Sequence, residues 1–153
     1  MEELSSILNS EPKELISTLD SYQVEIIENF LFSSSNNYLA CADKWLNAST
    51  ANTAKFGGEP NKITLYRDKL LDEIEKFLCG NETYNEDRKK ISESSDKSQK
   101  YIIGVISSAI GKSLGVAGPF IAPVIVLLLI SIGKMAINAW CEMRKEIKNS
   151  VPS

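Results

Sequence analysis

Residues 113–133 read SLGVAGPFIAPVIVLLLISIG and carry no charged side chain. In the longer segment from Tyr101 to Cys141, Lys112 and Lys134 are the only charges. A helix needs about 20 apolar residues to cross the hydrocarbon core of a bilayer, so this stretch has the length of a membrane span. A helix that is apolar on every side is also typical of a bundle centre, where other helices surround it. The stretch therefore fits two architectures: a helix in a membrane, or the buried central helix of a bundle.

Two helices are expected in this region, joined by a turn at 115–119. Residues 101–114 interleave large apolar side chains with small ones. Gly118-Pro119 places a proline in the first turn of a second helix, which we expect from about residue 119 to residue 148. Pro123 lies one turn later and removes one backbone donor. The sequence predicts a C-terminal hydrophobic helical hairpin.

Small residues recur on one face of the first of these helices. Gly111 and Gly115 form a small-xxx-small pair, which lets two helix backbones approach closely in lipid or in a buried core. The second helix offers large apolar side chains, and Trp140 follows them where an interfacial aromatic residue belongs in a membrane protein. The residues expected in membrane contact or helix packing are Gly104, Ser108, Gly111, Gly115, Pro119, Phe120, Val124, Leu127, Leu128, Ile130 and Trp140.

Basic side chains flank the hairpin on both outer sides. Net charge is −7 over residues 1–84 and +4 over residues 85–153, within an overall charge of −3. Positive flanks favour the cytoplasmic face of a membrane and attract anionic lipid. The basic residues do not cluster with aromatic ones, so nucleic acid is not expected as a partner. The flanking residues are Arg88, Lys89, Lys90, Lys97 and Lys100 before the hairpin, and Arg144, Lys145 and Lys148 after it.

The chain before the hairpin divides into two regions. Residues 1–84 carry apolar stripes at helical spacing, which predict helices over 2–32 with a break near Asp20, over about 37–52 and over about 62–78. Residues 85–100 are polar apart from Ile91 and form either a solvated helix or a linker. We therefore expect an all-α fold: an amphipathic helical region at 1–84, a boundary at 85–100 and the hairpin region at 101–153.

Catalytic and metal chemistry has little support in the composition. The sequence contains no His, which excludes His-based acid–base catalysis and His-ligated metal sites. Three widely spaced cysteines, Cys41, Cys79 and Cys141, fit reduced thiols in a cytosolic protein. Acidic pairs such as Asp72-Glu73 fit a solvated helix face, and an enzyme based on carboxylates stays a minor alternative. No cofactor, metal or catalytic residue is predicted.

Central apolar hairpins of this kind resemble, in arrangement only, those of colicin-type pore-forming domains and Bcl-2-like proteins. The resemblance implies a fold that is soluble first and inserts into a membrane later. We expect a non-enzymatic, membrane-associating protein, such as an oligomeric pore-forming or membrane-disrupting effector of the toxin or defence type. Its N-terminal helices would regulate the hairpin.

The expected location is the cytoplasm, at the anionic inner face of the cell membrane. Expected partners are membrane lipid and either further copies of the chain or a protein bound to the N-terminal helices. The alternative is a soluble helical-bundle adaptor or oligomerisation module, in which the hydrophobic hairpin is the buried core.

Overall fold

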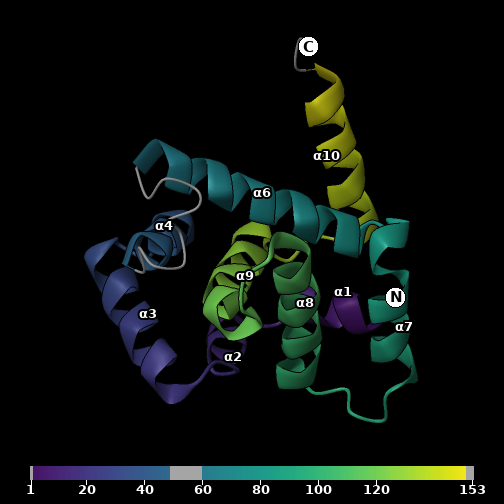
Figure 1. Ribbon diagram of the computed structural model, residues 1–153, viewed down its shortest axis with the longest axis horizontal. Coiled ribbons are helices and arrows are strands. Elements are labelled where there is room, and N and C mark those ends of the chain that lie inside the picture. Colours follow the sequence, from purple (N-terminus) through teal and green to yellow (C-terminus); the bar gives the residue numbers. More distant parts are fainter. Residues whose placement is uncertain (1, 49–59, 151–153) are drawn as a thin grey trace.

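The computed structural model describes residues 2–48 and 60–150, and these ranges contain helices and turns but no β-strand. The predicted all-α fold is thus confirmed (Figure 1). The elements are α1 (Glu2–Leu8), α2 (Pro12–Ile16), α3 (Ser21–Ser33), α4 (Tyr38–Ala48), α6 (Pro60–Leu78), the 3₁₀ helix η2 (Glu82–Tyr84), α7 (Asn85–Glu93), α8 (Gln99–Leu114), α9 (Gly118–Ile132) and α10 (Ile137–Ser150).

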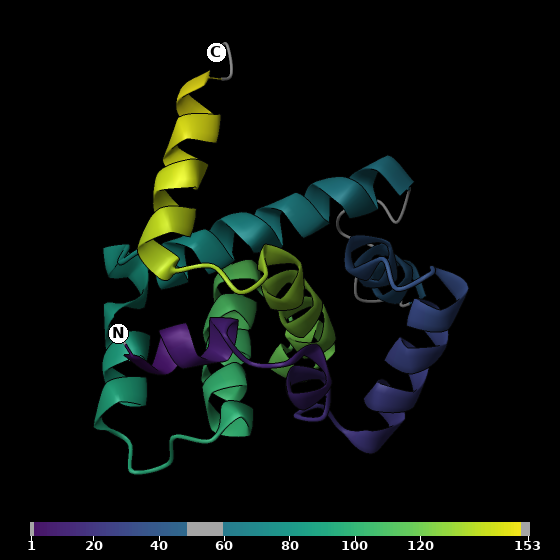
Figure 2. The same cartoon turned by 180° about the vertical axis from the view of Figure 1, so that it is seen from behind.

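Helix α9 lies at the centre of the bundle (Figures 1 and 2). It packs most extensively against α8 and α4, and also contacts α1, α2 and α6. Every side chain from Val124 to Leu129 is at most 1% exposed. Because neighbouring helices cover α9 on every side, it can be apolar all round in a protein whose mean hydropathy is only −0.12.

The surrounding helices are amphipathic and bury one face each. Helix α6 crosses one end of the bundle (Figures 1 and 2), with Tyr66, Leu70, Ile74 and Phe77 almost fully buried at three- and four-residue spacing. The break expected near Asp20 is present, because Asp20 is the N-cap of α3.

The chain turns by 114° between α8 and α9, so the two helices form an open hairpin. Gly115 ends α8 with a φ of 73°, and the N–H of Val116 donates to the carbonyl of Gly111 at 2.9 Å. Glycine adopts this left-handed conformation without steric penalty, which makes it a common helix terminator. The predicted turn at 115–119 is present.

The prediction of one continuous helix over 119–148 is wrong. Helix α9 ends at Ile132, Gly133 has a φ of 81°, and the chain becomes helical again at Ile137. The left-handed glycine redirects the chain, and α10 packs against α6 and α1 instead of extending α9. Helix α10 projects away from the bundle (Figures 1 and 2).

Three further segments can be compared with the sequence prediction. The polar segment 85–100 contains the short helix α7, and its one large apolar residue, Ile91, is fully buried. The helix predicted over 37–52 is confirmed from Tyr38 to Ala48, and residues 49–52 lie outside the described ranges. Helix α6 begins at Pro60, two residues before the predicted start.

Candidate functional site: the enclosed hairpin and its polar rim

The large apolar residues predicted to meet lipid lie mostly inside the bundle. Val124, Leu127 and Leu128 are 0% exposed. Phe120 is half-buried, with its ring centroid 6.3 Å from that of Trp45, and Ile130 is half-buried beside the core. The apolar environment that α9 requires is supplied by the neighbouring helices of the same chain.

Helices α8 and α9 together have the length and hydropathy of a membrane span. In the described ranges, no single helix meets the length and hydropathy expected of a bilayer span. Helices α8 and α9 meet them as a pair, across the 114° bend.

The predicted small-residue face packs partly inside the hairpin. A Cβ placed on Gly111 would lie 2.7 Å from the carbonyl oxygen of Val116, and one on Gly118 would lie 3.1 Å from the Cα of Ser108. These contacts let the two helices approach closely next to the turn. Gly104 differs, because a Cβ there would meet nothing within 4 Å.

Two polar side chains from the N-terminal helices bind the first turn of α9. Gln23, only 2% exposed, donates its amide Nε2 to the carbonyl of Pro119 at 2.8 Å. The indole Nε1 of Trp45 donates to the carbonyl of Phe120, also at 2.8 Å. Neither role was predicted from the sequence, because a Gln among apolar residues gives no sign of its partner 96 positions away.

Several of the predicted basic flanks bind groups within the protein. Arg88 donates to the carbonyls of Phe77 and Asn81 and thereby caps the C-terminal end of α6. Lys97 donates to the carbonyls of Ile91 and Ser92 and pairs with Glu3.

The basic residues on α10 also face acidic groups of the chain. Arg144 pairs with Asp72 and Glu75, Lys148 pairs with Glu75, and the exposed Lys145 lies 3.7 Å from Glu142. Lys89, Lys90 and Lys100 are exposed. Arg144 also lies 5.9 Å from the ring centroid of Trp140, which is 3% exposed and thus part of the core.

The pairing of Glu75 changes its titration. Partial burial raises the pKa of this carboxyl, but the hydrogen bonds and charges of Lys148 and Arg144 outweigh burial and hold the pKa below its usual value. Both acceptor oxygens are used, since Arg144 Nε lies 2.7 Å from one and Lys148 Nζ 2.9 Å from the other. Glu75 therefore fixes α10 to α6 in its ionised form.

The prediction of three reduced thiols is wrong for two of them. Cys79 and Cys141 form a disulfide that joins the end of α6 to α10 across 62 residues. Spacing along the sequence gave no sign of this pair, because it depends on where α10 packs. Cys41 is free and buried, and burial raises the pKa of its thiol to about 11, so its nucleophilic thiolate is disfavoured.

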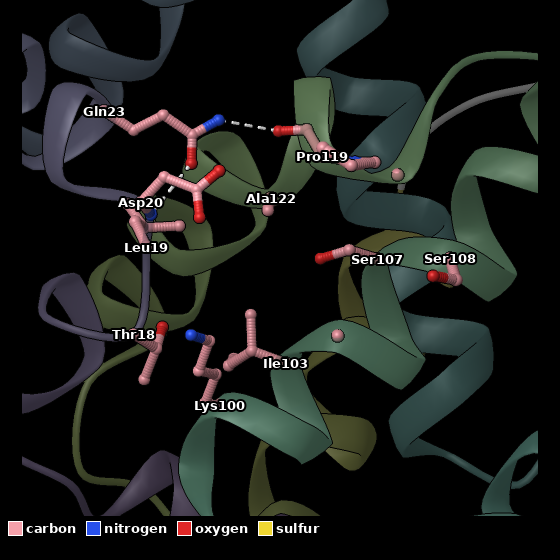
Figure 3. Close-up of a pocket in the computed structure, with 12 residues that line it drawn as sticks. Thr18, Leu19, Asp20, Gln23, Lys100, Ile103, Ser107, Ser108, Pro119 and Ala122 are labelled. Atoms are coloured by element: carbon pink, nitrogen blue, oxygen red, sulfur yellow. Dashed lines mark hydrogen bonds between the residues drawn. The ribbon is translucent and has the colours of Figure 1, made fainter.

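A cavity of about 240 Å³ opens between the corner joining α2 to α3 and the hairpin (Figure 3). Gly104, Ser108 and Pro119, three of the predicted packing residues, line it, together with Ser107, which was not predicted. In the residues that the structure describes, no group of three or more Cys, Asp or Glu side chains is arranged to hold a metal ion. No protein-family model, curated protein or solved structure matches the chain.

Proposed function

We propose that the chain is a non-enzymatic helical-bundle adaptor whose hydrophobic hairpin is its structural core. The observation that carries this proposal is the enclosure of Val124–Leu129 at no more than 1% exposure. Burial of apolar surface contributes about 25 cal/mol per Å², so exposing this helix would be unfavourable without a new apolar environment. The chain's own helices already provide that environment.

A partner protein on the N-terminal helices fits the distribution of exposed apolar side chains. Phe32 is 90% exposed and Tyr22 59% exposed on α3, and Leu39 on α4 is 39% exposed. Exposed aromatic residues are frequent anchors in protein interfaces.

Membrane association is the second candidate function, in which the bundle opens and α8 and α9 enter lipid as a pair. Its support is the uncharged stretch 113–133 and the combined hydropathy of α8 and α9. Opening would require α1, α2, α4 and α6 to separate from α9. It would also separate Gln23 and Trp45 from the carbonyls that they bind.

A pair of arginine substitutions distinguishes the two functions. Leu128→Arg places a charge in the centre of α9, whereas Leu65→Arg places the same charge on α6 at a side chain that is 56% exposed. If the hairpin is the core, Leu128→Arg unfolds the whole bundle and Leu65→Arg leaves it folded, as measured by circular dichroism and thermal denaturation. A Leu128→Arg variant that keeps its N-terminal helices folded and loses only membrane binding would support the membrane function.

Vesicles test the same choice on the intact chain. Full-length protein is added to dye-loaded vesicles of phosphatidylcholine and phosphatidylglycerol, with and without a thiol reductant. The adaptor predicts a soluble protein and no dye release in either condition. Dye release, with the protein recovered in the vesicle fraction, would overturn the adaptor proposal.

The number of free cysteine thiols in the protein indicates its cellular compartment. The expected cytoplasmic site predicts three alkylatable cysteines per chain, whereas an oxidising compartment preserves the Cys79–Cys141 disulfide and leaves only Cys41. The disulfide supports the oxidising compartment. Alkylation in denaturant at the moment of lysis, which exposes the buried Cys41, followed by intact-mass measurement counts the free thiols.

A further inference from the structure

The cavity beside the hairpin has an apolar wall and polar groups at its opening. Leu19, Ile103, Pro119 and Ala122 contribute apolar surface. Gly104 and Gly118 also line it: a Cβ on Gly104 would meet nothing within 4 Å, whereas the absence of a side chain on Gly118 lets α9 approach Ser108 closely. Small-molecule sites commonly combine such an apolar wall with a few polar groups.

Among the residues that line the cavity, Ser107 has a buried hydroxyl without a hydrogen-bond partner. The residue is 2% exposed, and its hydroxyl oxygen has no hydrogen-bond partner in the structure. Helical serines usually satisfy this group by donating to a carbonyl of the preceding turn, as Ser131 does to Leu128 at 2.7 Å. The Ser107 hydroxyl points instead into the cavity (Figure 3). A buried, unsatisfied hydroxyl aimed into a cavity indicates a missing hydrogen-bond partner there.

Two opposite charges stand at the same opening. The carboxylate of Asp20 and the ammonium of Lys100 extend toward the cavity from α3's N-cap and from α8 (Figure 3). Neither forms an ion pair with any residue that the structure describes. The backbone N–H of Asp20 is held by Gln23 Oε1 at 3.3 Å, and the same Gln23 binds Pro119, so the opening is tied to the start of α9.

We propose that this cavity binds a small zwitterion with an apolar side chain, of the α-amino acid class. Its ammonium group faces Asp20, and its carboxylate accepts hydrogen bonds from Lys100 and Ser107. Its side chain lies against Ile103, Leu19 and Ala122. Asp20 and Lys100 are both exposed, so a zwitterion is favoured because it pairs with both charges, whereas a ligand with a single charge pairs with only one of them. This site goes beyond the adaptor function and does not depend on it.

Three probes of matched shape test the preference in isothermal titration calorimetry with the full-length, oxidised protein. L-leucine carries both charges, L-leucinamide lacks the carboxylate, and 4-methylpentanoate lacks the amine. L-leucine is expected to bind at least tenfold more tightly than either analogue. Equal binding of all three probes, or no binding of any of them, would overturn the proposal.

Four variants test the residues. Ser107→Ala and Lys100→Met are each expected to weaken L-leucine binding at least fivefold, and Asp20→Asn is expected to do the same while keeping a good N-cap residue for α3. Lys112→Met on the same helix is the matched control, since Lys112 is exposed and does not line the cavity. Gly104→Leu is expected to fill the cavity and abolish binding. Each variant is first checked for a wild-type circular dichroism spectrum.

The variants also distinguish a built site from chance binding. Unchanged affinity in all three polar variants and in Gly104→Leu would place the probe elsewhere on the surface and overturn the proposal. If a variant fails to fold, protection of the α8 amides from hydrogen exchange by L-leucine in the wild-type chain decides. Protection confined to 99–108 supports the site, and its absence contradicts it.

Discussion

Gln23 donates a hydrogen bond to the carbonyl of Pro119, which is the backbone acceptor that Pro123 leaves without its helical partner. In an α-helix the carbonyl of residue 119 accepts from the N–H of residue 123. Pro123 has no N–H, and its ring pushes the carbonyl four residues earlier away from the helix axis. The side chain of Gln23, 96 residues earlier, supplies the missing donor at 2.8 Å. The N-terminal helices therefore stabilise the core helix at the point where Pro123 removes a backbone hydrogen bond.

A double-mutant cycle tests this compensation. Gln23→Leu leaves the Pro119 carbonyl without a donor and is expected to lower the free energy of unfolding by about 1–3 kcal/mol. In a Pro123→Ala background, the new backbone N–H binds the same carbonyl, so Gln23→Leu should cost less by about 1 kcal/mol. Urea denaturation of the four proteins measures the coupling. Strictly additive effects would show that Gln23 acts independently of the proline.

The disulfide between Cys79 and Cys141 restricts the unfolded chain. It joins residues 62 positions apart, and a disulfide typically stabilises a folded protein by about 2–4 kcal/mol. The double variant Cys79→Ser/Cys141→Ser is therefore expected to unfold at lower temperature than the oxidised protein.

A reductant is the matched control for that variant. It should lower the melting temperature of the wild-type protein and leave that of the double variant unchanged. A reductant that has no effect on the wild-type protein would show that the bond is not formed in solution.

The central apolar helix could be predicted from the sequence because its signal is local. An uncharged stretch from Ser113 to Gly133 must avoid water in any fold, and glycine and proline at 118–119 mark the turn before the helix. What surrounds the stretch is not local information. Lipid and a surrounding layer of amphipathic helices are equally suitable environments for these apolar side chains. The packing of α4, α6 and α8 around α9 shows that helices surround the stretch in this structure.

The polar part of the site was missed for a related reason. Gln23 lies on a helix face among apolar residues, and nothing near it in the sequence names Pro119 as its acceptor. Ser107 belongs to a run of small residues that alternate with large ones, and nothing in the sequence distinguishes its hydroxyl from those of its neighbours. Gly133 continues the uncharged stretch in the sequence, but its positive φ of 81° follows the end of α9 at Ile132.

Acid is expected to weaken the attachment of α10 to α6. The pKa of Glu75 is below its ordinary value of 4.5 in the folded protein, so its ion pairs contribute stability above that value. This contribution is lost as the pH falls through the lowered folded pKa. Between pH 6 and pH 3, the melting temperature of Glu75→Gln should therefore fall less than that of the wild type.

Glu146→Gln is the control for this pH dependence, because Glu146 is exposed on α10. Its melting temperature should follow the wild-type pH profile. If Glu75→Gln and wild type showed parallel profiles, the ion pairs with Arg144 and Lys148 would not contribute.

Ser107→Ala is expected to stabilise the ligand-free protein. The variant removes a buried hydroxyl that has no partner, and such a group costs about 1–3 kcal/mol. Ser131→Ala, at an exposed residue whose hydroxyl donates to the carbonyl of Leu128, should change stability by less than about 0.5 kcal/mol. Chemical denaturation compares the two variants, and a loss of stability in Ser107→Ala would mean that the hydroxyl already has a partner inside the protein.

Two glycine-to-alanine substitutions on α8 should have opposite effects. A Cβ on Gly111 would lie 2.7 Å from the Val116 carbonyl oxygen and 3.1 Å from the backbone nitrogen of Gly118. Backbone atoms cannot move aside as a flexible side chain can, so Gly111→Ala is expected to destabilise by about 1–3 kcal/mol. Gly104→Ala meets nothing within 4 Å and should stabilise by about 0.5–1 kcal/mol, because alanine restricts the unfolded chain more than glycine does. Thermal and urea denaturation measure both changes. Destabilisation by both variants would indicate that Gly104, too, is packed against something in solution, such as a second copy of the chain.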